Sequence, residues 1–263
     1  MDLNLKGKKA LVCAASRGLG RACAEALAAE GCELFICSRN QESIDRVAND
    51  LRERFAVKVQ TMAIDLSTSG AVEKLHEAAS KSLGQIDVLI NNIGGPPPSS
   101  AVETTDEQWR SGFEQVFLSS TRLTQLCVPK MCESKFGRIL TITSLSVVEP
   151  IDRLVVSTAM RSAATAFCKT LSKEVASEGV TVNTVMPGVI HTERIEQLRQ
   201  DKADRLGTTL EAEIQKTEAS IPKGRLGKPE ELAHLVTFLS SPLSGYITGM
   251  NFAVDGGLRK GGW

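Results

Sequence analysis

The sequence of 263 residues lacks several features that would assign it to a particular class of protein. Its 31 basic and 31 acidic side chains cancel, so no net charge favours nucleic acid or an anionic membrane as a partner. No apolar run is long enough to span a bilayer, and the first residues lack the apolar core and cleavage site of a signal peptide. We therefore expect a soluble, cytoplasmic protein that binds neither nucleic acid nor membrane.

The seven cysteines include no C-x-x-C pair. An odd number without that spacing argues against both a disulfide framework and a zinc site. Several of them lie in apolar segments, where a thiol in a reducing compartment behaves as a small buried hydrophobic group. We therefore expect free cysteines and no metal.

Short apolar segments alternate with segments of helical composition along the whole chain, without a linker, repeat or low-complexity tract. This alternation predicts one α/β domain with a parallel sheet covered by helices on both faces. Near-continuous apolar strands fit such burial. The expected strands are 8–14, 32–37, 56–65, 86–92, 137–144, 179–188 and 249–257.

Two further segments are expected to wall a binding pocket. "GGPPPSS" (94–100) is the only Pro/Gly cluster, and it predicts a stiff loop at the carboxyl end of the fourth strand. Residues 191–220 have the pattern of two helices inserted before the last strand. Because such insertions often act as lids, we predict that this one covers the substrate.

The segment "AASRGLG" (14–20) lies between the first strand and the first helix. Gly18 and Gly20 let the backbone turn tightly and approach a pyrophosphate, while the helix N-terminus offers free N–H groups and a positive dipole end. A glycine pair is weak evidence alone, but in this strand–turn–helix context it predicts a nucleotide site.

The end of the second strand indicates which nucleotide binds. An acidic residue there would hold a free ribose 2′-hydroxyl, but this chain has Ser38 and Arg39 in "ICSRN". Arg17 adds a second guanidinium in the glycine loop, and guanidinium matches the geometry of a 2′-phosphate. The pattern favours NADP(H) over NAD(H), with a merely solvated Arg39 as the alternative.

Five motifs occur in one known order and together resemble the short-chain dehydrogenase/reductase family, of the one-domain type that includes acyl-carrier-protein ketoreductases. The resemblance covers residues from about 5 to 258. It implies a Rossmann-like, doubly wound sheet of about seven parallel strands, hydride transfer between a nicotinamide and a carbonyl or alcohol, and a homo-oligomer, usually a tetramer. The motifs are the glycine loop, "INNIG" (90–94), "GRILTITS" (137–144), "VNTVMPG" (182–188) and "YITGMNFAVDGG" (246–257).

The resemblance also implies which residues would contact the cofactor. The glycine loop would hold the phosphates, two residues after the third strand would flank the adenine, two residues of "INNIG" would line the adenine ribose, and the segment after the sixth strand would bracket the nicotinamide amide. In that order the residues are Ala14, Ser16, Arg17, Gly18, Leu19 and Gly20; Asp65 and Leu66; Asn92 and Gly94; and Pro187, Gly188, Ile190 and Thr192.

The chain departs from the family at its active site. The family serine is present as Ser144, but the tyrosine position holds Ser157, the lysine position holds Arg161 and the helix asparagine position holds Val116. The first glycine of the loop is Ala14, a mild change if its backbone keeps a negative φ. The chain resembles a divergent branch that carries "GGPPP" together with this serine and arginine.

These replacements change what the site can do. A serine hydroxyl is a far weaker acid than tyrosine, whose pKa is about 10, but it still donates a hydrogen bond to a carbonyl. Arginine keeps its charge and does not shuttle protons, but it can hold ribose hydroxyls and stabilise a developing alkoxide. We predict that Ser144 and Ser157 orient the substrate and that Arg161 polarises the site.

The source of the proton stays open between several groups. His191 has the side chain best tuned to neutral pH, although a solvent-facing loop histidine is the simpler interpretation. Three charged residues of the loop after Ser144, or a water held by the two serines, are alternatives. The only tyrosine, Tyr246, lies in a segment that the resemblance places near subunit contacts. The loop residues are Glu149, Asp152 and Arg153.

Two main hypotheses of function follow. The first is an NADP(H)-dependent oxidoreductase with an atypical site, acting on a small carbonyl or alcohol. The second is a nucleotide-binding protein with little catalysis that acts as a regulator or assembly subunit, because the family's Tyr, Lys and Asn are all replaced. A related fold with another cofactor or reaction is a third.

Overall fold

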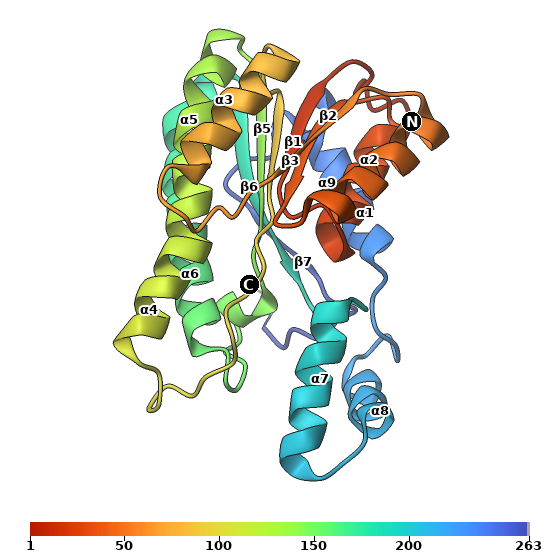
Figure 1. The fold of residues 1–263 in the computed structure, drawn as a ribbon, viewed down its shortest axis with the longest axis vertical. Coiled ribbons are helices and arrows are strands. Elements are labelled where there is room, and N and C mark those ends of the chain that lie inside the picture. The colour runs from red at the N-terminus through yellow and green to blue at the C-terminus, as the bar shows by residue number, and fades with distance from the viewer. Residues whose placement is uncertain (262–263) are drawn as a thin grey trace.

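The computed structural model describes residues 1–261, which form a parallel sheet between two layers of helices (Figure 1). The strand order is β3-β2-β1-β4-β5-β6-β7, and every neighbouring pair is parallel. The order changes direction between β1 and β4, which makes the carboxyl edge there a switch point. The predicted doubly wound sheet of seven strands is confirmed. The strands are β1 (Lys9–Val12), β2 (Glu33–Ser38), β3 (Val59–Ala63), β4 (Val88–Asn91), β5 (Gly137–Ile142), β6 (Val180–Pro187) and β7 (Asn251–Val254).

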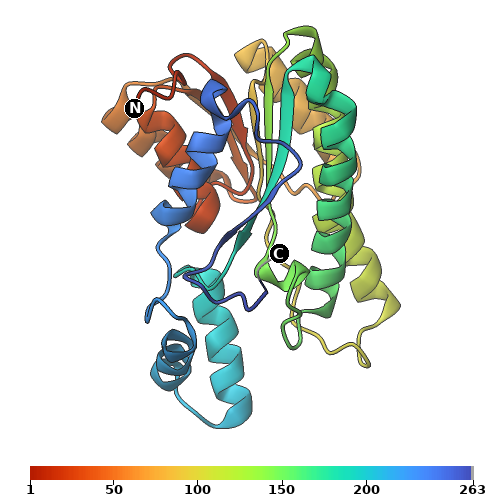
Figure 2. The ribbon, with the colours of Figure 1, turned by 180° about the vertical axis from the view of Figure 1, so that it is seen from behind.

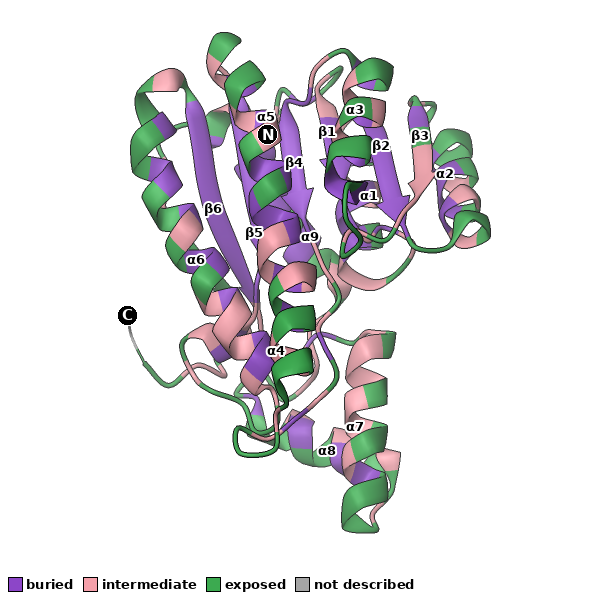
Figure 3. Cartoon of the chain, turned by 60° about the vertical axis from the view of Figure 1, so that its left-hand side comes forward, coloured by how far each residue is buried: buried purple, intermediate pink, exposed green. Residues whose placement is uncertain are grey.

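Helices cover both faces of the sheet because its central strands are apolar on both sides. Every residue of β4 and β5 is buried (Figure 3). Along β1, Ala10 and Val12 belong to one hydrophobic core while Leu11 belongs to the other, as the alternation of strand side chains requires. One face carries α1 (Gly18–Ala29), α2 (Gln41–Phe55) and α9 (Pro229–Ser240), and the other carries α3 (Ala71–Leu83), α5 (Ser119–Glu133) and α6 (Val155–Val175).

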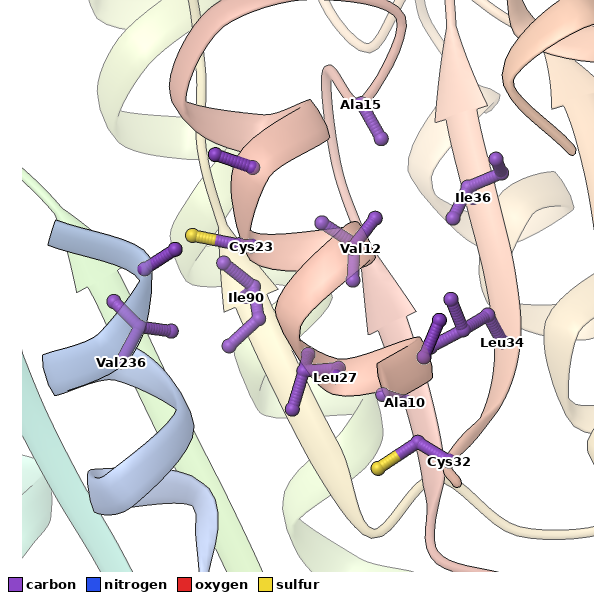
Figure 4. Packing of buried hydrophobic residues seen from close by; sticks show 14 of the residues in the cluster. Ala10, Val12, Ala15, Cys23, Leu27, Cys32, Leu34, Ile36, Ile90 and Val236 are labelled. Carbon is purple, nitrogen blue, oxygen red and sulfur yellow. The ribbon is translucent and has the colours of Figure 1, made fainter. Parts of the chain in front are cut away.

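The first core joins segments that are far apart in the sequence. Val12 and Ile90 of the sheet pack with Cys23 and Leu27 of α1 and with Val236 of α9 (Figure 4). All seven cysteines are free, and six of them are buried. Burial raises the pKa of the Cys23 thiol to about 12 and keeps it protonated. The expectation of small buried thiols is confirmed.

One helix of the second layer contains a π-helical segment. Helix α4 (Asp106–Gly112) continues through a π-helix over Phe113–Leu118 into α5. The wider π turn displaces backbone carbonyls from their usual partners. The hydroxyl of Ser120 donates to the carbonyls of Val116 and Phe117, 2.9 Å away in each case. The hydroxyls that follow the π-helix therefore satisfy the carbonyls that it displaces.

The two helices expected within 191–220 are present as α7 (Glu193–Leu206) and α8 (Leu210–Ser220). They extend beyond the carboxyl edge of the sheet (Figure 2). Glu213 is fully buried between them, where Lys202 lies at 2.7 Å and Lys216 at 2.8 Å from its carboxylate. Hydrogen bonds from these lysines lower the pKa of Glu213 to about 2. Among the described residues, no helix combines the length and the apolar character needed to cross a bilayer.

Replacing Glu213 with Gln should loosen the α7–α8 pair, because two lysines lose their shared carboxylate. Amide hydrogen exchange in α7 and α8 at pH 7 should become faster. The ionised form is favoured by the fold, so its contribution is present above pH 4.5 and is lost as the pH falls toward 2. The difference from wild type should shrink over that range. Glu211→Gln, an exposed carboxylate in the same helical turn, is the control; equal exchange in both variants would contradict the prediction.

Candidate active site

The loops after β1, β4 and β5 and the starts of α6 and α7 meet at the carboxyl edge of the sheet. Loops at the carboxyl ends of parallel strands share one edge, and ligands bind there in folds of this type. The group Ser144, Ser157 and Arg161 and most of the proposed cofactor residues lie in these segments. Arg39 follows β2, Asp65 and Leu66 follow β3, and Pro187, Gly188 and Ile190 lie at or just after the end of β6. The sheet thus gathers residues that are distant in sequence along one side of the molecule.

The glycine loop leads directly into α1. Arg17 is the N-cap of the helix, and no acidic residue occupies the first turn. Its side chain makes no capping hydrogen bond, which leaves N–H groups of the first turn open to an anion. A Cβ on Gly20 would overlap the carbonyl oxygen of Ala14 and lie 2.6 Å from Nδ2 of Asn92. Glycine at position 20 is therefore required by the close approach of α1 to the strand ends.

Ala14 does not meet the condition under which its replacement of glycine would be mild. Its φ is +50°, in the left-handed region, rather than negative. The cause lies in its two neighbours. The N–H of Cys13 donates to the carbonyl of Ile90 in β4, and the N–H of Ala15 donates to the carbonyl of Cys37 in β2, on the opposite side of β1. In a regular strand, the N–H groups of residues two apart point to the same side. The backbone must reverse at Ala14, and alanine adopts this conformation at an energetic cost.

The region expected to receive the adenosine end is open and polar. Arg39 is exposed directly after β2, and Asp65 is exposed directly after β3. Hydrogen bonds from Ser67, with a smaller effect of the Arg39 charge, lower the pKa of Asp65. Leu66 is half-buried and packs against the second core. Arg17 forms an ion pair with Glu193 of α7, and both side chains are more than half exposed.

The segment after β6 approaches the glycine loop. Thr192 accepts a hydrogen bond from the N–H of Ile195 to cap α7, and its methyl carbon would lie 3.4 Å from a Cβ on Gly18. A Cβ on Gly188 would lie 2.7 Å from Cα of Asp255, so the chain is close-packed there. Ile190 is only 3% exposed and belongs to the first core. Its backbone, rather than its side chain, is thus available to a ligand.

The guanidinium of Arg161 lies buried beneath the site. Nη1 donates to the carbonyls of Ile142 (2.9 Å) and Thr143 (3.1 Å), and Nη2 donates to the carbonyl of Ile93 (2.9 Å). No carboxylate of residues 1–261 lies within 4.0 Å of it. Burial, and to a lesser degree the charge of Arg194, lowers the pKa of Arg161 to about 10. The group stays charged at neutral pH.

Both serines have hydroxyl hydrogens that their observed contacts leave unused. Oγ of Ser157 accepts a hydrogen bond of 3.1 Å from Nε of Arg161, one helical turn away on α6. Oγ of Ser144 accepts one of 3.1 Å from the N–H of Ser146, at the start of a short 3-10 turn. A hydroxyl that accepts from a cation is polarised to donate its own hydrogen. The arrangement suits donation to a ligand oxygen.

A small cavity of about 10 Å³ lies behind Arg161. It is lined partly by Val116, whose side chain has no hydrogen-bonding group, and by Asn91. Oδ1 of Asn91 is buried and has no hydrogen-bond partner among residues 1–261. A cavity of this size holds about one water molecule, and it does not have room for a substrate.

The alternative proton donors lie toward solvent. His191 is exposed and pairs with Glu196 at 2.8 Å, as expected for a loop histidine. Tyr246 is fully exposed. In the loop after Ser144, Arg153 has a φ of +61° and lies 3.8 Å from Glu103, and Asp152 is exposed. Glu149, in the same loop, accepts a hydrogen bond from the backbone of Lys260.

Two residues that the sequence did not single out also hold the "GGPPP" loop. Nη2 of Arg194, on α7, donates to the carbonyl of Pro96 at 2.8 Å. Nε2 of Gln115, on the π-helix, donates to the carbonyl of Gly94 at 3.1 Å. Both contacts depend on how distant segments pack, and a charged or amide residue on a helix gives no signal of such a role.

Comparison with known proteins identifies the family. The family profile described as Enoyl-(Acyl carrier protein) reductase matches residues 13–259. The chain is 35% identical to the uncharacterized oxidoreductase YvaG of Bacillus subtilis, over 99% of each chain. It is 32% identical to the 3-oxoacyl-[acyl-carrier-protein] reductase FabG of Escherichia coli, over 97% of this chain and 99% of that one. The chain belongs to the short-chain dehydrogenase/reductase family.

Solved structures of this oxidoreductase family have the same fold over nearly the whole chain. YwfH, an NADPH-dependent reductase involved in bacilysin biosynthesis, superimposes with a TM-score of 0.93 and is 30% identical, covering 97% of this chain and 100% of its own. L-sorbose reductase from Gluconobacter frateurii, solved with NADPH and L-sorbose, gives a TM-score of 0.94 at 30% identity, covering 99% and 100%.

Replacing Ala14 with Gly should raise the free energy of unfolding by about 0.5–1 kcal/mol, because glycine adopts the left-handed conformation without strain. Urea denaturation measures the change. Ala15→Gly is the control: Ala15 is fully buried and has no positive φ, so that variant should be destabilised. Loss of stability in both variants to the same extent would show that Ala14 is not strained.

Proposed function

We propose that this protein is an NADP(H)-dependent oxidoreductase that moves hydride between the nicotinamide and a carbonyl or secondary alcohol. The observation that carries the proposal is the hydrogen bond from Nε of Arg161 to Oγ of Ser157. It couples a buried positive charge to a hydroxyl at the carboxyl edge of the sheet, beside the ends of β4 and β5. This pair keeps the electrostatic part of the family's site, although the tyrosine and the lysine are replaced.

The residues present fit a dinucleotide. The first turn of α1 has N–H groups free for a pyrophosphate, and Gly20 lets the backbone come close to it. Arg39 and Arg17 are exposed, and their guanidinium groups would bind a 2′-phosphate, Arg17 in place of its ion pair with Glu193. On the nicotinamide side, the backbone at Ile190 and the hydroxyl of Thr192 would meet the carboxamide. Asp65, Leu66, Asn92 and Gly94 would border the adenosine, and Pro187 and Gly188 would border the nicotinamide.

The chain's own groups would act on the substrate oxygen. NADPH supplies the hydride when it is bound. The hydroxyls of Ser144 and Ser157 would donate hydrogen bonds to the carbonyl oxygen, and Arg161 would stabilise the negative charge that develops there through Ser157. Because serine is a weak acid, the proton would reach the product oxygen from solvent through the Ser157 hydroxyl. Helices α7 and α8 would cover the substrate and limit the entry of water.

The second candidate is a nucleotide-binding protein without catalysis. Two observations favour it: Val116 offers no hydrogen bond where the family has asparagine, and Tyr246 is fully exposed. Such a protein would bind NADPH but would not oxidise it. Assembly into a homotetramer, which the family resemblance implies, remains a prediction for either candidate.

Replacing Arg39 with Gln should weaken NADPH binding about tenfold, because a charged hydrogen bond to the 2′-phosphate is lost. NADH binding should not change, since NADH lacks that phosphate. Titration of NADPH and NADH fluorescence measures both affinities. Arg46→Gln on α2, whose side chain is 73% exposed, is the control and should change neither. An equal loss of both cofactors in Arg39→Gln would argue against a 2′-phosphate contact.

Replacing Ser157 with Ala should slow hydride transfer about 100- to 1000-fold, because the donor to the substrate oxygen is removed. Its NADPH affinity should stay within about twofold of wild type. The measurement is single-turnover loss of NADPH absorbance against pooled carbonyl compounds, with enzyme in excess. Thr158→Val is the control, since Oγ1 of Thr158 has no hydrogen-bond partner among residues 1–261 and faces another side of α6. Flat traces for wild type despite NADPH binding would favour the second candidate.

A further inference from the structure

Gly95 faces three polar groups at the edge of the site. A Cβ at this position would lie 3.6 Å from Nη2 of Arg194, 3.8 Å from Oγ of Ser157 and 3.9 Å from Nη2 of Arg161. The φ of Gly95 is not in the left-handed region, so the backbone conformation does not require glycine. The missing side chain leaves space between the hydroxyl of Ser157 and two guanidinium groups.

The second cation, Arg194, has spare hydrogen-bonding capacity. Its only hydrogen bond to residues 1–261 is the 2.8 Å contact from Nη2 to the carbonyl of Pro96. A guanidinium has five N–H groups, so four remain for solvent or a ligand. No carboxylate of the described chain lies within 4.0 Å of it. Burial lowers the pKa of Arg194, so its charge is already partly removed from water.

The positive charges of Arg161 and Arg194 lie close together in a partly buried region, where an anion would stabilise both. Arg161 on α6 and Arg194 on α7 approach the same point from two different helices. The charge of Arg194 disfavours the charged form of Arg161. Buried charges in proteins are normally paired. Arg161 is satisfied mainly by carbonyl oxygens, which leaves one N–H on Nη2 beside the free donors of Arg194.

We propose that Arg194, with Arg161 behind it, selects an oxo acid: a substrate whose reacting carbonyl lies one or two carbons from a carboxylate. This inference rests on the proposed function, because Ser157 is taken as the group that bonds the carbonyl oxygen. Oγ of Ser157 and Nη2 of Arg194 lie 3.8 and 3.6 Å from one point, so a small molecule placed there that bonds both would carry its anion close to the reacting carbonyl. The remaining N–H groups of Arg194 match the two oxygens of a carboxylate.

A neutral substrate would leave this arrangement without a partner. A thioester or a sugar presents only uncharged oxygens to the two guanidinium groups. Such substrates would bind without regard to charge at position 194. The two possibilities therefore differ in one measurable property, the preference for an acid over a neutral molecule of the same shape.

The test compares oxamate, an unreactive mimic of a 2-oxo acid, with oxamide, its neutral counterpart of nearly the same shape. Both are titrated by calorimetry into wild-type protein saturated with NADP⁺. Oxamate should bind at least about tenfold more tightly than oxamide, because a charge-assisted pair is stronger than a neutral contact. Equal binding of the two probes, or no binding of oxamate, overturns the inference.

Variants assign the preference to Arg194. Arg194→Gln should weaken oxamate binding about 10- to 100-fold and leave oxamide unchanged. Arg194→Lys should keep part of the preference, because the charge remains. Arg205→Gln removes a charge from the exposed last turn of the same helix and should change nothing. Gly95→Ala should weaken both probes, since its methyl group would occupy the shared space without a clash. Unchanged oxamate binding in Arg194→Gln overturns the inference.

The outcomes separate this inference from the proposed function. Protein that binds oxamate through Arg194 but never oxidises NADPH supports the anion site and contradicts catalysis. Protein that reduces neutral ketones with NADPH but binds oxamate no better than oxamide supports the oxidoreductase and overturns the oxo-acid preference.

Discussion

The site depends on one buried guanidinium. The carbonyls of Ile142 and Thr143 at the end of β5 and of Ile93 beyond β4 have no further strand to pair with, and Arg161 donates to all three. An unpaired buried carbonyl destabilises the fold, so the hydrogen bonds from Arg161 stabilise the ends of both strands. The same bonds hold the guanidinium in one position. Its Nε donates to Ser157. Lysine has donors on a single nitrogen and could not span these positions. The serine and the arginine therefore form one unit.

On the cofactor side, the backbone of the glycine loop, rather than a side chain, makes the hydrogen bonds that tie the loop to two strands. Ala14 reverses the direction of the N–H groups, so that Cys13 donates to Ile90 of β4 and Ala15 donates to Cys37 of β2. This reversal brings its carbonyl against α1, which excludes any side chain at Gly20. The strain at Ala14 is thus the local consequence of anchoring the loop to two strands. A loop held in this way offers its N–H groups to a ligand without further rearrangement.

Sequence patterns predicted what local composition determines. Apolar strands, helical periods, the inserted α7–α8 pair and the free cysteines followed from short segments, and the ordered motifs indicated the family. The φ of Ala14 and the position of Arg194 could not be predicted in this way. The first depends on hydrogen bonds to two other strands, and the second on a contact with Pro96, 98 residues away in the chain. Glu213 reads as an ordinary surface charge until α7 and α8 pack around it.

The start of α7 links the two sides of the site. Thr192 lies beside Gly18, Glu193 pairs with Arg17, and Arg194 bonds the "GGPPP" loop. One turn of a single helix therefore contacts both the cofactor loop and the loop that faces the substrate. Because a helical turn moves as a unit, any shift of α7 changes both contacts together. The physical connection between the cofactor loop and the substrate loop therefore lies in Thr192, Glu193 and Arg194.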